Sequence, residues 1–206
     1  LSVHRGIVTY EPTELVITAR AATPLIEIET TLEEHGQMLA FEPPHFSSSA
    51  TIGGTLACGL SGPRRPYTGA ARDFVLGTTV LNGKGDRLSF GGQVMKNVAG
   101  YDVSRLMVGA MGTLGVMLDV SLKVLPRPET EISLGFEMDP IRAIERMNRL
   151  TGTPVPLSAA CHAAGRLVIR LSGTQLGVCA ARRGLGGDEI DGTPFWRGIN
   201  EQTHPW

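Results

Sequence analysis

ATIGGTLACGLSG, residues 50–62, is the stretch around which we organise the rest of the chain. Most of its side chains are small, so a bulky group could approach this backbone closely. Gly53 and Gly54 open a predicted short helix that runs through Leu60. The first N–H groups of a helix have no intrahelical partner and carry the positive end of its dipole, so they suit a phosphate or pyrophosphate.

The same small residues are equally typical of a close helix crossing or a tight turn, so both interpretations stay open for this stretch alone. The segment lacks the Lys-Ser/Thr ending of a P-loop and the spacing of a GxGxxG fingerprint. By motif, this excludes an ATP-binding P-loop and a standard NAD-binding fold. A nucleotide cofactor bound in some other fold remains the leading hypothesis.

Composition narrows the class of protein. The chain has 206 residues, 42% hydrophobic and 19% charged, which is enough for one globular domain and part of a second. Its formal net charge of -1 gives no electrostatic footprint for nucleic acid or for an anionic membrane. The longest apolar run, residues 106–118, is too short to span a bilayer. We therefore expect no transmembrane segment and no nucleic-acid partner.

Three cysteines, Cys58, Cys161 and Cys179, show no CxxC or metal-ligand spacing. They predict a reduced, cytoplasmic chain without disulfides. The sequence begins LSVHRG, with neither an initiator Met nor an apolar signal region, so we expect it to start inside a longer protein.

The first half of the chain predicts hairpins and short helices. Residues 6–10 and 15–20 are β-rich around Pro12, which favours a tight reversal. Thr23 is the expected N-cap of a helix that ends at Gly36. The two prolines in residues 41–46 exclude regular structure there.

Further along, residues 74–82 and 87–90 predict a second hairpin. Asp102 is the expected cap of a short helix whose buried side carries Val103 and Leu106. Apolar and polar residues alternate through residues 116–124, which predicts a strand with one buried face.

Pro126-Arg127-Pro128 is the expected domain boundary, dividing the chain into residues 1–128 and 129–206. Beyond it the pattern predicts a strand, a helix opened by Asp139, two strands, and a helix from Thr174. This β-α-β-β-α order predicts a small antiparallel sheet with helices on one face. The expected fold class is therefore α+β.

Several ordered segments together resemble one known family. They are FEPPHFSSSATIGGTLACGLSGPRRPYTGAARDFVLG (41–77), QVMKNVAGYDVSRLMVGAMGTLGVMLDVSLKVLPRP (93–128) and FWRGINEQ (195–202). They are similar to the FAD-binding subunits of bacterial glycolate oxidases, within the FAD-binding superfamily of vanillyl-alcohol oxidase and p-cresol methylhydroxylase (PCMH). The resemblance implies an FAD-binding PCMH-type domain lacking its first subdomain, followed by a small antiparallel-sheet, cap-like domain. The superfamily's first Gly-rich phosphate loop lies upstream of the segment that matches Gly6.

The resemblance also implies where FAD lies. It places the pyrophosphate along the backbone of residues 50–54, the flavin beside residues 61–69, and walls of the site at residues 100–101 and 112–116. The implied cofactor-binding residues are Ala50, Thr51, Ile52, Gly53, Gly54, Ser61, Gly62, Gly69, Gly100, Tyr101, Gly112, Gly115 and Val116. No catalytic residue and no metal site is assigned. One departure is GAMGTLGVML at residues 109–118, where catalytic relatives commonly read GSEGTLGIIT.

The activity that the resemblance implies is oxidation of a 2-hydroxy acid such as glycolate, with hydride transfer to the flavin and electron passage onward. The implied partners are a homologous flavoprotein subunit and an iron-sulfur subunit, through which the complex could lie peripherally on the inner face of the membrane. The alternative is a non-catalytic scaffold or electron-relay subunit beside a catalytic partner. A cofactor-free module is the remaining possibility.

Side chains that could act at such a site also have structural interpretations. Arg64, Arg65 and Arg72 could neutralise a carboxylate or phosphate, or pair with neighbouring acids. Tyr101 could stack on the flavin or be a buried core aromatic. His45 precedes the glycine-rich stretch and could face a ligand, although a structural role is equally compatible with its position.

Overall fold

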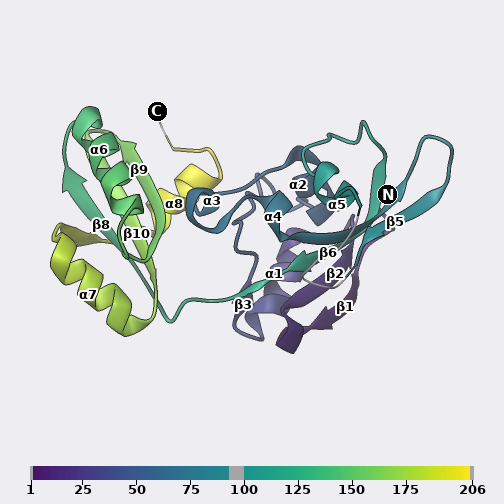
Figure 1. Cartoon of the computed structure of the whole chain (residues 1–206), viewed down its shortest axis with the longest axis horizontal. Helices are drawn as coiled ribbons and strands as arrows, with labels where there is room; N and C mark the ends of the chain where they lie inside the picture. The colour runs from purple at the N-terminus through teal and green to yellow at the C-terminus, as the bar shows by residue number, and fades with distance from the viewer. Residues whose placement is uncertain (1, 93–99, 205–206) are drawn as a thin grey trace. The chain divides into compact units, whose positions relative to one another are not determined.

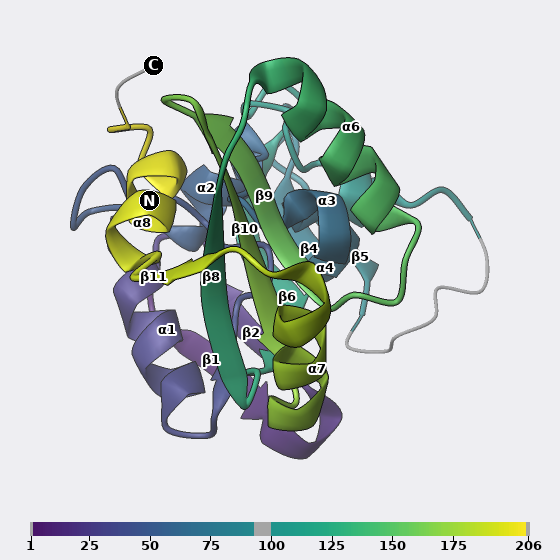
Figure 2. The same cartoon turned by 90° about the vertical axis from the view of Figure 1, so that its left-hand side faces the viewer.

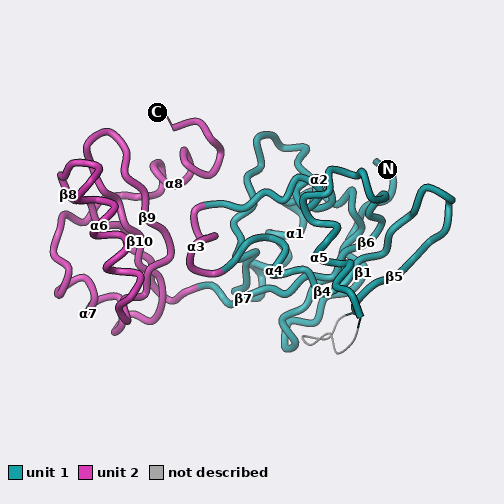
Figure 3. Tube along the Cα trace, turned by 45° about the horizontal axis from the view of Figure 1, so that its top comes forward, with its two compact units in different colours: residues 1–62, 69–127 teal, residues 63–68, 128–206 magenta. Residues whose placement is uncertain are grey.

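The computed structural model describes residues 2–92 and 100–204. The chain forms two compact units (Figure 3). Unit 1 comprises Leu1–Gly62 and Gly69–Arg127, and unit 2 comprises Pro63–Thr68 and Pro128–Trp206. The sequence did not indicate that a short segment from inside the first unit's sequence packs with the second.

Unit 1 is built on a five-stranded antiparallel sheet (Figure 1). Its strands follow the order β1-β2-β6-β4-β5. Both predicted hairpins are confirmed, since β1 pairs with β2 across a 3-10 turn and β4 pairs with β5. The strand bounds are β1 Ile7–Glu11, β2 Val16–Arg20, β4 Val75–Leu81, β5 Arg87–Gly91 and β6 Val116–Lys123, with a separate pair formed by β3 Gln37–Met38 and β7 Leu125–Pro126.

Short helices pack with this sheet to form the core of unit 1. Their bounds are α1 Leu25–Glu33, α2 Ile52–Cys58, α4 Ala71–Phe74 and α5 Val103–Leu106. Ile28 of α1, Ile52 of α2 and Leu122 of β6 are fully buried in one apolar cluster. The glycine-rich stretch is therefore part of the core packing as well as of the surface.

Three local predictions in unit 1 were wrong. Thr23 does not cap α1, whose N-cap is Pro24, because the Thr23 hydroxyl is bonded to the backbone N–H and C=O of Gly6. Leu106 is 61% exposed, and Ser104 is the buried residue of α5. Val116 lies exposed while Ser121 is buried, because register shifts between β4 and β6 interrupt the alternation.

Unit 2 is a four-stranded antiparallel sheet in the order β11-β8-β10-β9. Its strands are β8 Thr130–Glu137, β9 Leu157–Ala163, β10 Arg166–Gly173 and β11 Asp188–Ile190. The predicted β-α-β-β-α order is confirmed by α6 (Pro140–Thr151) and α7 (Gln175–Leu185), capped by Asp139 and Thr174 as expected. The sequence did not predict β11 or the last helix, α8 (Thr193–Asn200).

Helices cover both faces of this sheet, rather than the one face expected (Figure 2). Leu167 and Ile169 of β10 pack in a cluster with residues of α6 and α7. Val168, between them in sequence, points to the opposite face and packs with Trp196 of α8. The alternation of side chains along one strand therefore supports two apolar clusters.

Candidate cofactor site

The first amides of α2 are bonded within the protein. Ile52 N–H donates to the Thr23 carbonyl (3.0 Å), Gly53 N–H to the Ala21 carbonyl (2.8 Å), and Gly54 N–H to the Thr51 hydroxyl (3.3 Å). The prediction that these amides are bare is therefore wrong, while the position of a pyrophosphate along residues 50–54 stays a prediction. The physical reason is that α2 begins against the chain that leaves β2, so the carbonyls of that segment accept its orphan donors.

Close packing explains why residue 53 is glycine. A Cβ atom there would lie 2.6 Å from the Ala21 Cβ and 2.7 Å from the Ala21 carbonyl oxygen. Ile52 beside it is fully buried, whereas Gly54 is exposed. For Gly53, the close-packing alternative is the one that the structure supports.

The C-terminal end of α2 brings the two glycine-rich segments together. Gly109 N–H donates to the Leu56 carbonyl and Met111 N–H to the Ala57 carbonyl, both at 2.9 Å. Gly59 ends the helix in a left-handed conformation, and a Cβ at Gly59 would lie 3.2 Å from the Gly109 Cα. Residues 50–62 and 109–116, which the sequence separates, are thus joined by backbone hydrogen bonds.

The loop that follows Met111 presents unused backbone donors. Within residues 2–92 and 100–204, no acceptor is bonded to the amides of Gly112, Leu114 and Gly115. Gly112 is exposed and has a φ of 75°, and a Cβ built there meets open space. A turn whose N–H groups have no bonded acceptor is a suitable place for phosphate oxygens.

Exposed apolar side chains surround these donors. Met111 is 67% exposed, Leu114 52% and Val116 38%. Binding sites for cofactors combine apolar lining with a few polar groups that fix orientation. The loop of residues 109–116 therefore fits both the charged and the ring portions of a dinucleotide.

Gly115 itself is needed for packing. Its φ is 147°, and an added Cβ would lie 2.7 Å from the Val80 Cγ1 and 2.9 Å from the Leu81 carbonyl oxygen. The absence of a side chain at Gly115 lets the loop lie against β4. A ligand could therefore contact this residue only through its backbone.

Tyr101 is 96% exposed, so it is not a buried core aromatic. Gly100 beside it has a φ of 91° and is also exposed. The Tyr101 carbonyl accepts from Val103 N–H at 2.9 Å, just before α5. Residues 93–99, which also belong to the segment that carries the resemblance, lie outside the described residues.

Residues Ser61, Gly62 and Gly69 are held by neighbouring backbone. The Ser61 hydroxyl accepts from Ala71 N–H (2.9 Å), and Gly62 N–H donates to the Phe41 carbonyl (2.8 Å). Gly69 has a φ of 106° that only glycine adopts readily.

Several candidate side chains are already engaged. Arg64 is buried and forms an ion pair with Glu131, which fits the structural interpretation of this arginine. Arg65 and Arg72 are exposed. His45 pairs with Glu29 at 2.9 Å. His162, which was not among these candidates, donates from Nε2 to the Met138 carbonyl at 3.0 Å.

Among the described residues there is no group of three His, Cys, Asp or Glu side chains that could hold a metal ion. The same part of the chain contains no helix with the length and hydropathy needed to cross a bilayer.

Comparisons with known proteins show the family to which the chain belongs. A family described as FAD binding domain matches residues 1–105. Glycolate oxidase subunit GlcE of Escherichia coli (strain K12) is 54% identical over 203 residues, covering 98% of this chain and 58% of that protein. Glycolate oxidase subunit GlcD of Bacillus subtilis (strain 168) is 35% identical over 130 residues, covering 62% of this chain and 27% of that protein.

The chain therefore spans little more than half the length of the first relative and about a quarter of the second. A solved structure of alkyldihydroxyacetonephosphate synthase matches 98% of this chain and 45% of its own, with a TM-score of 0.75 and 15% sequence identity. That likeness concerns the fold alone.

Proposed function

Since the chain belongs to the FAD binding domain family and its cofactor is FAD, we propose that it is the FAD-binding subunit of a complex that oxidises glycolate or a related 2-hydroxy acid. The observation that carries this proposal is the 54% identity to glycolate oxidase subunit GlcE over 98% of the chain. The amides of Gly112, Leu114 and Gly115, which have no bonded acceptor among the described residues, and the exposed apolar side chains beside them support it independently.

We place FAD along that loop and beside Tyr101. The amides of Gly112, Leu114 and Gly115 bind its phosphates, and the exposed apolar side chains of the loop cover its rings. Half-buried Ala50 and Thr51 and exposed Gly54 contribute at the start of α2, while Ile52 and Gly53 act through packing. Ser61, Gly62, Gly69, Gly100 and Val116 complete the proposed set.

When bound, FAD supplies a two-electron acceptor for the oxidation of a hydroxyl-bearing carbon. The chain's own residues bind and orient the cofactor and exclude water from its rings. Because the contacts are mostly from backbone amides, changes of bulk or charge test them better than removal of a side chain.

The proposal includes partners. A homologous flavoprotein subunit, of the kind that GlcD represents, and an iron-sulfur subunit would take up the electrons. Association with a membrane, in this scheme, comes through these partners.

A second candidate function is that of a scaffold or electron relay that binds FAD but leaves substrate oxidation to a partner. Two side chains of types that could act on a substrate are bonded within the protein, which favours this second candidate. The Arg64 guanidinium, suited to a substrate carboxylate, is buried in an ion pair, and the His162 ring is bonded to a backbone carbonyl.

The two candidates are separated by reduction of the flavin. The chain is purified alone and in complex with its co-expressed partner subunits, and the visible flavin bands are followed under anaerobic conditions after glycolate is added. Bleaching of the isolated chain's flavin supports a catalytic subunit, and bleaching only in the complex supports a relay. Absence of flavin bands from this chain in both preparations would overturn the whole proposal.

A further inference from the structure

The segment Pro63–Thr68, which we call the strap, groups with unit 2, although the residues on both sides of it belong to unit 1. Its helix α3 (Arg65–Thr68) lies against β9 of the unit 2 sheet. The strap also sits between Gly62 and Gly69, two of the residues that we place beside the flavin. Whatever holds the strap therefore acts on both of these glycines.

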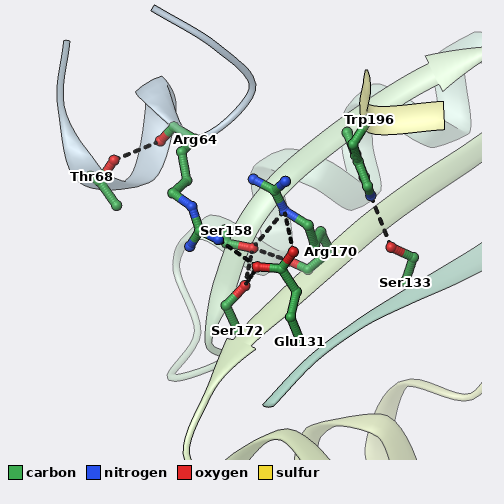
Figure 4. Close-up of polar contacts among 8 residues, drawn as sticks. All are labelled: Arg64, Thr68, Glu131, Ser133, Ser158, Arg170, Ser172 and Trp196. Carbon is green, nitrogen blue, oxygen red and sulfur yellow. Dashed lines mark hydrogen bonds and ion pairs between the residues drawn. The ribbon is translucent and has the colours of Figure 1, made fainter. Parts of the chain in front are cut away.

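Arg64 holds the strap in two ways (Figure 4). Its guanidinium forms an ion pair with Glu131 of β8, and the arginine as a whole is only 6% exposed. Its carbonyl accepts from the amides of Tyr67 (2.9 Å) and Thr68 (3.0 Å), which closes the turn of α3. Arg64 is buried, whereas the Glu131 side chain is 37% exposed, so loss of the carboxylate would leave the desolvated guanidinium without this partner.

Glu131 is itself fixed by the unit 2 sheet. The Ser172 hydroxyl donates to its carboxylate at 2.5 Å, and Arg170 Nε lies 3.8 Å from its other oxygen (Figure 4). Arg170 in turn donates to the Ser158 hydroxyl at 3.1 Å. The carboxylate therefore meets Arg64 at a position that β9 and β10 define.

Tyr67, near the far end of the strap, is half-buried. Burial raises the pKa of Tyr67, and a hydrogen bond with the Thr151 side chain at the end of α6 opposes that shift. On the unit 1 side, the bond from Gly62 N–H to the Phe41 carbonyl fixes the point at which the strap begins.

From this geometry we propose that Arg64 and Glu131 are positioning residues for FAD. Their ion pair fixes the strap and, through it, the backbone of Ser61, Gly62 and Gly69. The inference rests on the proposed function, because it takes these three residues to face the flavin. Neither charged side chain contacts the cofactor in this scheme.

The test compares Arg64→Met, Glu131→Gln and Arg64→Lys with the parent chain. Arg183→Met is the matched control, since Arg183 is an exposed arginine of α7 in the same unit and lies outside the strap and the proposed site. Hydrogen exchange is measured over residues 60–70 without ligand, and the FAD Kd and the visible bands of the bound flavin are then measured. Circular dichroism checks that each variant is folded.

We expect Arg64→Met and Glu131→Gln to speed exchange at Tyr67 and Thr68, to shift the flavin bands, and to weaken FAD binding by about three- to tenfold. Arg64→Lys keeps the charge and a donor but loses the planar fork, so its Kd falls between those of the parent and Arg64→Met. The control matches the parent in every measurement.

Faster exchange with an unchanged Kd and flavin spectrum would show that the strap is only structural, which overturns the positioning role and leaves the proposed function intact. Unchanged exchange would also overturn it, since the ion pair would not then hold the strap. Should Arg64→Met not fold, a parental Kd and spectrum in Arg64→Lys would have the same effect. A parent chain that binds no FAD, alone or with its partner subunits, would overturn the proposed function together with this inference.

Discussion

Gly53 and Gly54 are adjacent in α2 but have opposite surroundings. Gly53 lies against the backbone of Ala21, while a Cβ at Gly54 meets only the Thr51 hydroxyl, at 3.2 Å. Packing therefore requires a glycine at position 53, whereas the surface at position 54 has room for a side chain.

We therefore expect Gly53→Ala to lower the free energy of unfolding by about 1 to 3 kcal/mol, because the new methyl group overlaps a backbone that cannot rotate away. Gly54→Ala should stay within about 1 kcal/mol of the parent and lean towards stabilisation, since Ala is the better helix former. Urea unfolding of both variants measures the difference. Equal stability for the two would contradict the packing explanation.

The three cysteines are free thiols with different surroundings. Cys58 is exposed, whereas burial raises the pKa of the Cys161 thiol. Because the thiolate is the reactive form, the raised pKa lowers the reactivity of Cys161, and exposure favours labelling of Cys58.

We expect a fast phase of labelling by a thiol-reactive dye at neutral pH that Cys58→Ser removes. Cys161→Ser, the control, should leave that phase unchanged. Loss of the fast phase in Cys161→Ser instead would mean that β9 opens more readily than its position in the sheet indicates.

Among the helices, α6 has the most complete start signal. Asp139 accepts hydrogen bonds from the amides of Ile141 and Arg142, both at 3.0 Å, and Pro140 occupies the first turn. The bond from Arg142 N–H is the main cause of a lowered pKa for Asp139. A carboxyl whose folded pKa is depressed contributes stability above its unfolded pKa, and that contribution is lost as the pH falls through the folded value.

Asp139→Ala should therefore lower the Tm at neutral pH, and the gap to the parent should close as the pH drops below about 4, near the ordinary pKa of Asp. Asp139→Asn is the matched control, because Asn is as good an N-cap but does not titrate. Its Tm should stay near the parent's at neutral pH. A gap between parent and Asp139→Ala that persists in acid would show that the cap does not depend on the charge.

Elements with strong local signals could be predicted from the sequence, and those that depend on distant partners could not. The alternating strands and the caps at Asp102, Asp139 and Thr174 involve neighbours along the chain. Thr23, by contrast, is bonded to Gly6, which lies 17 positions away, and nothing near Thr23 indicates this. The short β11 is defined by its pairing with β8, which has no local signature.

The same distinction holds for the site. The family resemblance placed a wall of the site at residues 112–116. The structure adds that Met111 and Leu114 are exposed and that, within the described residues, the amides of Gly112, Leu114 and Gly115 have no bonded acceptor. The amides of residues 52–54 looked equally available in the sequence, because only the folded chain reveals the acceptors at Ala21 and Thr23. Arg64 and Glu131 are 67 positions apart, so no local pattern could pair them.

Placing a charge on the loop tests the site as a unit. Leu114→Glu adds a carboxylate at an exposed position, so it should leave the fold stable and weaken FAD binding about tenfold by repelling the phosphates. Leu176→Glu is the control, because Leu176 is 86% exposed on α7, in the other unit. Titration with FAD measures both variants, and equal affinity for the two would remove residues 109–116 from the proposed site.

Because Pro63–Thr68 belongs to unit 2, the two units of this protein cannot be separated or exchanged by dividing the chain at one point. A single cut after Arg127 does not release two finished modules, because the first would keep an arginine whose carboxylate belongs to the second. Grafting a foreign second half would likewise require an acidic residue at the place of Glu131. The two units are interleaved in sequence, so recombination has to exchange them together.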